Sequence, residues 1–143
     1  MCVILNVSMY NLSEKLDKNS AKQLSPITLA FVGDAVYTLF VRKSIVLKKD
    51  LKGGELNKRT SAVVKASAQA EFSRKILPFL TEEELEIFKR ARNAKKGTRA
   101  KSASVSEYNA STGFEALVGY LYLIGDGDRL NYLLNLEEDG ETL

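Results

Sequence analysis

With 143 residues, of which 45% are hydrophobic, the chain can bury one core of ordinary domain size but hardly two, so we expect a single domain. The net charge of +3 is mild, but the absence of histidine excludes a Ser-His-Asp triad, a Cys-His pair and a histidine-ligated zinc site. Any catalysis must therefore use carboxylates, lysines, hydroxyl groups or a metal ion held by oxygen ligands.

The first predicted element is a long helix. Ser25 and Pro26 supply a cap residue and a proline at the first helical position, and helical periodicity then continues to about Lys48. The stretch is apolar nearly all round, which is typical of a buried helix. We therefore expect it to be the central helix of the fold.

Two glycines at 53–54 break the chain after the first helix. Residues 55–77 then predict one long second helix, which ends near Pro78. Residues 81–84 (TEEE) form a capping box that opens a third helix through about Asn93, with acids at its start and bases at its end. The macrodipole of a helix favours that order of charges.

The C-terminal part predicts two further helices, at about 105–124 and from 129 to about 137, and the run 125–128 (GDGD) between them supplies a C-cap glycine and an N-cap aspartate. Because strand patterns are almost absent, the predicted fold class is all-α. We expect residues 1–23 to be a partly flexible leader, residues 24–137 to form the folded domain, and residues 138–143 to be an acidic tail.

Nothing in the sequence predicts a membrane span. The apolar run from Ile27 to Val41 has 15 residues with Asp34 near its centre, which is shorter than the ~20 residues needed to cross a bilayer. The single cysteine, Cys2, cannot form an internal disulfide and fits a reducing compartment. We therefore expect a cytoplasmic protein.

Two acidic residues, Asp34 and Glu115, lie inside the two most apolar stretches of the chain. A carboxylate removed from water costs several kcal/mol unless a cation or strong hydrogen-bond donors meet it. Two such residues suggest a shared cation. The glycine before Asp34 supports this interpretation, because glycine inside a helix usually marks the close approach of another backbone or a ligand.

Each acid also has a structural explanation. Asp34 could form a buried ion pair with Arg42 or Arg74. Glu115 could belong to a capping box whose N-cap is Thr112. Both alternatives remain open from the residues alone, although a cap does not explain a carboxylate in the middle of an apolar helix.

The segment 89–101, which we call the basic segment, carries no acid. Phosphate backbones favour such clusters because each phosphate neutralised releases counterions. A solvated helix end and loop is the alternative. No aromatic residue lies in the segment, which argues against stacking on single strands and for a duplex recognised by shape and backbone. Its bases are Lys89, Arg90, Arg92, Lys95, Lys96, Arg99 and Lys101.

These motifs together resemble a known family. Residues 29–36 (LAFVGDAV) resemble the signature helix of ribonuclease III domains, and residues 114–121 (FEALVGYL) resemble their second acidic motif. The order of further segments is similar to the bacterial Mini-III ribonucleases over roughly residues 24–134. These segments are 56–61 (LNKRTS), 66–71 (ASAQAE), 89–98 (KRARNAKKGT) and 111–117 (STGFEAL).

The resemblance implies a dimeric ribonuclease III endonuclease fold without a separate double-stranded-RNA-binding domain. Asp34 and Glu115 would be the catalytic metal ligands, holding Mg²⁺ or, as a substitute, Mn²⁺. Full-length ribonuclease III has carboxylates at two further positions, where this chain has Ala30 and Thr112. The number of metal ions therefore stays open.

The resemblance also implies the substrate, double-stranded RNA, and in particular the stem of precursor 23S ribosomal RNA, cut to leave 5′-phosphate ends. A ribosomal protein that presents this RNA is a further candidate partner. Two other functions remain open: a non-catalytic RNA-binding module on the ribosome, and a helical DNA-binding regulator. The expected RNA contacts are Arg90, Arg92, Asn93, Lys95, Lys96, Thr98, Arg99 and Lys101.

Overall fold

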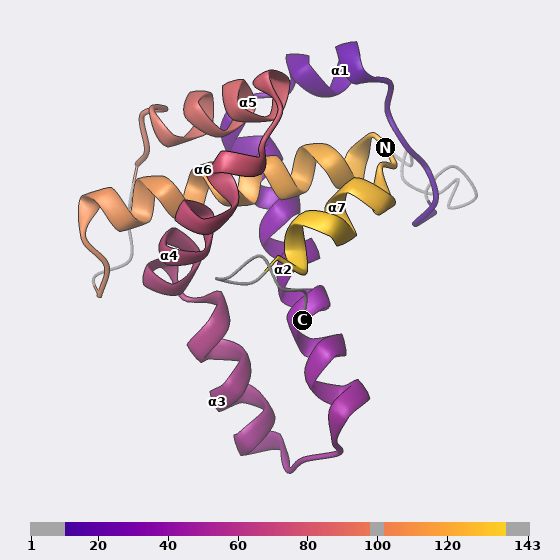
Figure 1. Cartoon of the computed structure of the whole chain (residues 1–143), viewed down its shortest axis with the longest axis vertical. Coiled ribbons are helices and arrows are strands. Elements are labelled where there is room, and N and C mark those ends of the chain that lie inside the picture. The colour runs from indigo at the N-terminus through magenta and orange to yellow at the C-terminus, as the bar shows by residue number, and fades with distance from the viewer. Residues whose placement is uncertain (1–10, 98–101, 137–143) are drawn as a thin grey trace, which may run out of the picture.

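The computed structural model describes residues 11–97 and 102–136, and every regular element in these ranges is a helix (Figure 1). The predicted all-α fold class is confirmed. The elements are α1 (Lys18–Gln23), α2 (Pro26–Lys48), α3 (Gly53–Val64), α4 (Ala66–Ile76), the short 3-10 helix η3 (Leu77–Phe79), α5 (Glu82–Arg92), α6 (Val105–Leu123) and α7 (Gly127–Leu134).

The predicted helix starts after Ser25 and Thr81 are confirmed by their caps. The Ser25 side chain accepts a hydrogen bond from the backbone N–H of Thr28, with Pro26 at the first helical position of α2. Thr81 opens α5 with a complete capping box. The last helix, α7, begins at Gly127 rather than at the predicted residue 129, with Asp126 as its cap, and Gly125 has the positive φ of 76° that favours glycine.

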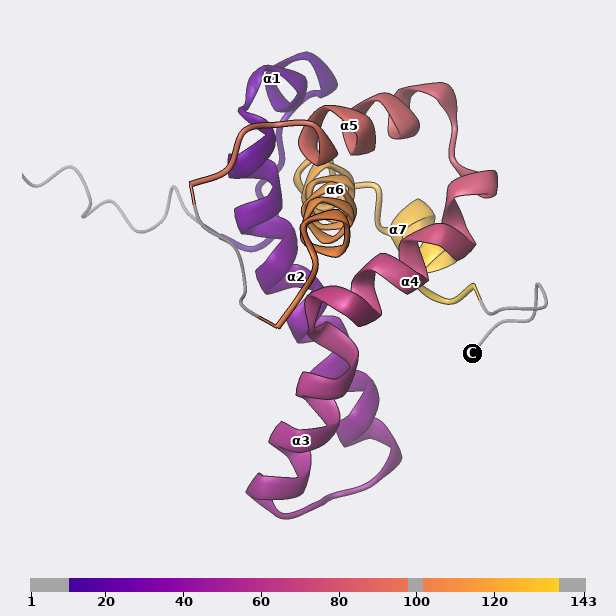
Figure 2. The ribbon, with the colours of Figure 1, turned by 90° about the vertical axis from the view of Figure 1, so that its left-hand side faces the viewer.

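The central helix is α6, not α2 as the sequence predicted. Figure 2 shows α6 nearly end-on, with α2, α4, α5 and α7 around it. Its middle is buried on every side, from Ser111 to Phe114 and from Ala116 to Leu121, because apolar or small residues occur all round it. The α2 helix is equally apolar, but it lies at the edge of the bundle and exposes part of its surface.

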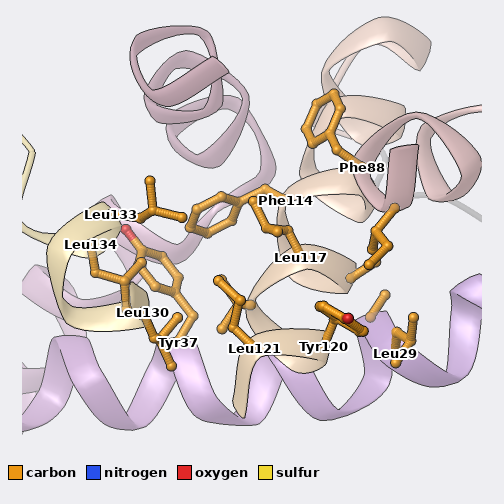
Figure 3. Packing of buried hydrophobic residues seen from close by; sticks show 14 of the residues in the cluster. Leu29, Tyr37, Phe88, Phe114, Leu117, Tyr120, Leu121, Leu130, Leu133 and Leu134 are labelled. Carbon is orange, nitrogen blue, oxygen red and sulfur yellow. The ribbon is translucent and has the colours of Figure 1, made fainter. Parts of the chain in front are cut away.

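The core forms where the neighbours of α6 contribute large side chains (Figure 3). Phe114 of α6 makes edge-to-face contacts with Tyr37 of α2 and Phe72 of α4, with ring centroids 4.8 and 5.6 Å apart. Such aromatic pairs add to the free energy gained by burying apolar surface. Phe88 of α5 and Leu133 of α7 are also buried in this cluster.

The predicted long second helix is wrong, because the chain bends at Lys65 and forms α3 and α4 instead. Lys65 has extended backbone angles (φ −65°, ψ 155°), although neither glycine nor proline stands there. The bend lets α3 pack against α2 while α4 packs against α6, so tertiary packing overrides local propensity. The α3 helix also begins at Gly53 rather than after the glycine pair.

No helix in the described ranges is both long enough and apolar enough to cross a lipid bilayer.

Candidate active site

The site is built where α2 and α6 cross at very close range. A Cβ atom added to Gly33 of α2 would lie 1.7 Å from the backbone oxygen of Glu115, and one added to Gly119 of α6 would lie 2.0 Å from the backbone oxygen of Leu29. No side chain fits in either place. The two glycines thus let the backbones touch, and Asp34 follows directly after the point of contact.

The crossing brings Asp34 and Glu115 to one cavity of about 340 Å³. Asp34 is exposed and Glu115 is half-buried, so the expectation of two carboxylates removed from water holds only in part. Ala30 and Thr112, which stand where the resembling family has two more carboxylates, line the same cavity. The sequence segments that carry the two acidic motifs therefore meet in space.

The carboxyl group of Glu115 has a strongly perturbed acidity. Burial is the largest cause, and the nearby carboxylate of Asp34 is the second; together they raise the pKa of Glu115 from 4.5 to about 8. A hydrogen bond from Gln69 acts in the opposite direction. Without a cation, Glu115 is therefore largely protonated at neutral pH.

The two structural explanations for these acids do not hold. Asp34, Arg42 and Arg74 all lie in the described residues, and no ion pair joins Asp34 to either arginine. Thr112 lies in the middle of α6 and its hydroxyl donates to the backbone oxygen of Tyr108, so it is not an N-cap for Glu115. The acid pair is thus left to face the cavity.

Gln69 is a buried residue of the site that the sequence did not reveal. Its side-chain amide donates to Glu115 Oε2 at 3.2 Å and to the backbone oxygen of Val64 at 2.9 Å. Its own oxygen, Oε1, is buried without a hydrogen-bond partner among the described residues. A glutamine between two alanines on a helix carries no local signal of such a role.

The donor set fits a divalent cation that prefers oxygen ligands. Two carboxylates reach one cavity, and a bound cation would relieve the repulsion that raises the pKa of Glu115. Mg²⁺ is commonly held in proteins by one or two carboxylates together with waters and substrate phosphates. The part of the chain that the structure describes holds no cluster of three or more metal-binding side chains. Asp34 and Glu115 would leave most of the coordination shell to water and substrate.

The first residues after α5 bring the basic segment to the same cavity. Lys95, Lys96 and Gly97 line it together with Asp34 and Glu115. Lys95 is exposed. A cationic side chain at the edge of a carboxylate site is well placed to contact a phosphate group that approaches the metal ligands.

The other bases of the segment differ in what they contact. Lys96 donates to the backbone oxygens of Ala91, Arg92 and Ala94 and so caps the C-terminal end of α5. Arg90 donates to the backbone oxygens of Lys22 and Leu24 and ties α5 to the end of α1.

Arg92 donates to the side-chain oxygen of its neighbour Asn93, which is exposed. The remaining predicted RNA contacts, Thr98, Arg99 and Lys101, lie outside the described residues.

Comparisons with known proteins show the family of this chain. A model of the ribonuclease III domain matches residues 27–126, which include both acidic motifs. The Mini-ribonuclease 3 of Clostridium tetani is 46% identical over 89% of this chain and 85% of its own length. That of Thermoanaerobacter sp. is 48% identical over 87% of each protein.

A solved structure from Fusobacterium nucleatum shares the fold. It is 35% identical to this chain and superposes with a TM-score of 0.75, over 80% of this chain and 93% of that one. The chain therefore belongs to the ribonuclease III family, among the Mini-ribonuclease 3 proteins, and is an endoribonuclease.

Proposed function

We propose that the protein is a magnesium-dependent endoribonuclease that cleaves double-stranded RNA, with Asp34 and Glu115 as metal ligands and catalytic residues. The observation that carries this proposal is the convergence of the two carboxylates on one cavity that Lys95 also lines. Bound Mg²⁺ supplies Lewis-acid activation of water and of the phosphodiester, which accounts for catalysis without histidine. Mn²⁺, a similar hard cation, would substitute.

The residues of the chain divide the work between binding the metal and binding the substrate. Asp34 is exposed and open to the cavity, whereas Glu115, whose pKa is raised by burial, must lose its proton to become a ligand. Lys95, at the edge of the cavity, would neutralise a phosphate next to the scissile bond. Family resemblance suggests that the products carry 5′-phosphate ends.

The surface of α2 supports a homodimer. Ile27, Phe31, Leu39 and Val46 are exposed at intervals that place them along one side of the helix, and Phe31 is 79% exposed. An apolar face of this kind on a small domain is typical of an interaction surface. A two-fold axis here would place a second, identical site near the opposite strand of a duplex.

The physiological substrate that the family suggests is the stem of precursor 23S ribosomal RNA. A ribosomal protein that presents the stem is a further proposed partner, and both would place the protein in the cytoplasm. RNA itself is the expected substrate of a ribonuclease III domain. The preference for this stem rests on family resemblance.

A cleavage assay on a long RNA duplex tests the proposal. We expect cutting of both strands with Mg²⁺, no cutting with EDTA, and no cutting of a DNA duplex of the same sequence. Asp34→Asn should abolish cleavage while the protein stays folded by circular dichroism and still binds the duplex. An Asp34→Asn protein that is well folded and fully active would contradict the assignment.

A further inference from the structure

A neutral hydrogen-bond donor holds the more buried of the two proposed metal ligands. Gln69 belongs to α4, its side chain is only 1% exposed, and its Nε2 lies 3.2 Å from Glu115 Oε2. Asp34 and Glu115 face the same cavity, so the Glu115 carboxyl group, once ionised, is repelled by Asp34 until a cation binds. The contact with Gln69 opposes movement of the carboxyl group under this repulsion.

The orientation of the Gln69 amide is set by its surroundings. An amide nitrogen has two hydrogens, and both are used here, one toward Glu115 and one toward the backbone oxygen of Val64. Rotating the amide by half a turn would bring its oxygen against the oxygen of Val64, which can only accept a hydrogen bond. The donor is therefore fixed toward Glu115.

This orientation leaves the amide oxygen of Gln69 without a partner among the described residues. Leaving a buried polar atom without a hydrogen bond destabilises the folded protein, and such atoms are rare in native structures. The amide is thus arranged to donate to Glu115 and Val64 at the expense of its own oxygen. A side chain whose only purpose was to fill the core would not need that arrangement.

The absence of a charge on Gln69 also matters. An arginine or lysine at this position would neutralise Glu115 and take the place of the cation. A glutamine orients the carboxylate and leaves its negative charge available. Because Val64 ends α3 and Gln69 lies in α4, the same amide also ties the bend at Lys65 to the site.

We propose that Gln69 is a positioning residue that holds the Glu115 carboxylate in the orientation in which it binds the divalent ion. The proposal rests on the proposed function, since it requires Asp34 and Glu115 to be metal ligands. Hydrogen-bond partners of metal ligands typically change metal affinity or activity by about 10- to 100-fold when they are replaced.

The test compares two variants of buried α4 residues by calorimetric titration with Mn²⁺ in the absence of RNA. Gln69→Met keeps an unbranched side chain of similar size but removes the donor. Ser73→Ala is the matched control, because Ser73 is fully buried and its hydroxyl donates to Ala70 within the same helix. We expect about 10- to 100-fold weaker Mn²⁺ binding for Gln69→Met and wild-type affinity for Ser73→Ala.

In cleavage assays, Gln69→Met should need a correspondingly higher Mg²⁺ concentration for half-maximal rate, with most of the maximal rate restored at saturation. Mn²⁺ affinity equal to wild type in a folded Gln69→Met protein would overturn the proposal and leave Gln69 as a structural contact. Failure of the wild-type protein to bind Mn²⁺ would instead overturn the proposed function and this inference together.

A measurement on the wild-type protein covers the case in which Gln69→Met does not fold. The side-chain amide resonances of Gln69 in a ¹⁵N NMR spectrum should shift when Mg²⁺ is added, because their acceptor becomes a metal ligand. In Asp34→Asn, which keeps the Gln69 contact but loses one ligand, the shift should be lost or need much more Mg²⁺. Resonances that do not respond in the wild-type protein, while Mg²⁺ binds, would contradict the proposal.

Discussion

At the scale of single residues, the chemistry of the site depends on how two carboxylates share one cavity. Asp34 is exposed, whereas burial and the nearness of Asp34 raise the pKa of Glu115 to about 8. Like charges close together cannot both ionise freely without a cation between them. The arrangement that raises the pKa of Glu115 therefore also favours the binding of a divalent ion, which would relieve the repulsion between the two carboxylates.

This raised pKa predicts an unusual dependence of stability on pH. Between pH 4.5 and about 8 the folded protein keeps a proton on Glu115 that the unfolded chain has released. The free energy of unfolding should therefore fall as pH rises, by up to about 1.4 kcal/mol per pH unit. In thermal melts of metal-free protein across this range, the melting temperature of the wild-type protein should decrease with rising pH relative to that of Glu115→Gln. The variant lacks the carboxyl group that releases the proton.

At saturating Mg²⁺, the free energy of unfolding should depend on pH in the same way for the wild-type protein and for Glu115→Gln, because the cation binds the ionised form of Glu115. Comparison with Glu115→Gln is needed because a second carboxyl group also makes stability depend on pH. Burial raises the pKa of Glu84, but hydrogen bonds from Arg129 and Thr81 outweigh burial and lower it, so the stability that Glu84 contributes is lost in acid. Identical pH profiles for the wild-type and variant proteins in EDTA would contradict the raised pKa.

Two neighbouring lysines should separate RNA binding from stability. Lys95 lines the cavity and is exposed, so Lys95→Ala should leave the melting temperature unchanged and lower the salt dependence of RNA binding by about one unit of log-log slope. Lys96→Ala removes the cap on three backbone oxygens of α5 and its loop and should cost about 1–2 kcal/mol of stability.

Binding would be measured on the Asp34→Asn background, so that the duplex stays intact, at several salt concentrations. If the salt dependence of RNA binding is the same for Lys95→Ala as for its parent, Lys95 does not contact the RNA phosphates, and the alternative of a solvated surface is correct. RNA contacts by Lys96 and by Arg90 stay predictions. The guanidinium group of Arg90 donates to backbone oxygens at the end of α1.

Sequence reasoning found Asp34 and Glu115 because charges in apolar helices stand out against their surroundings. It did not find Gln69, since a polar residue among small residues of a helix is ordinary until the neighbouring helix is placed. It also could not separate Lys96, which caps α5, from Lys95, because adjacent lysines carry the same local signal. Partners from other elements are what distinguish such residues.

At the scale of elements, the contact between α2 and α6 fixes the site. Gly33 and Gly119 are the two positions at which these helices have no room for a side chain. A change in the distance between the helices would move Asp34 relative to Glu115. The glycine in the acidic motif is therefore needed for the close contact of the helices, whereas the aspartate beside it is the proposed metal ligand.

Substitution of Gly33 should separate this contact from ordinary helix propensity. The added methyl group of Gly33→Ala would lie 1.7 Å from a backbone oxygen, so the helices must move apart, and we expect a loss of about 3 kcal/mol or more together with loss of cleavage. Gly54→Ala is the control: it lies in α3 with nothing within 4 Å and should be neutral or slightly stabilising.

Urea denaturation of the two variants and the wild-type protein gives the comparison. A Gly33→Ala protein with wild-type stability and activity would show that the helices can separate without harm to the site. Equal destabilisation of both variants would show that the loss does not come from the contact at Gly33, because helix propensity favours alanine over glycine.

Helix starts could largely be predicted from sequence because caps are local, and those at Ser25 and Thr81 are confirmed, whereas α7 begins at Gly127 rather than at the predicted residue 129. The bend at Lys65 could not, because no glycine or proline marks it and the reason lies in packing against two different helices. The choice between α2 and α6 as the central helix also required tertiary structure, since both are apolar nearly all round. Local signals set where helices begin, and packing sets where they bend and lie.

At the scale of the whole molecule, the exposed apolar face of α2 explains why the sequence wrongly predicted α2 to be the central helix. Apolar residues on both sides of a helix predict burial within one chain, but a second copy of the chain can bury the outer side equally well. Leu39 and Phe31, which are 66% and 79% exposed, belong to that side. The proposed dimer thus explains why α2 has the composition of a central helix and the position of an outer one.

A charge on this face should therefore produce a monomer. Leu39→Glu places a carboxylate in the proposed interface without touching the cavity, and we expect sedimentation as a monomer and loss of double-strand cuts. Val105→Glu is the matched control, because Val105 is 56% exposed at the first turn of α6, where an acid is favourable. A wild-type protein that sediments as a monomer at micromolar concentration would count against the dimer.

The central claim is that Asp34 and Glu115 together hold a divalent ion. Crystals soaked in Mn²⁺ and measured near the manganese absorption edge test it most directly. We predict an anomalous peak within about 2.0–2.3 Å of a carboxylate oxygen from each residue, and no such peak in Asp34→Asn crystals. A wild-type map without a peak at this pair, or with a peak bound by other residues alone, would contradict the claim.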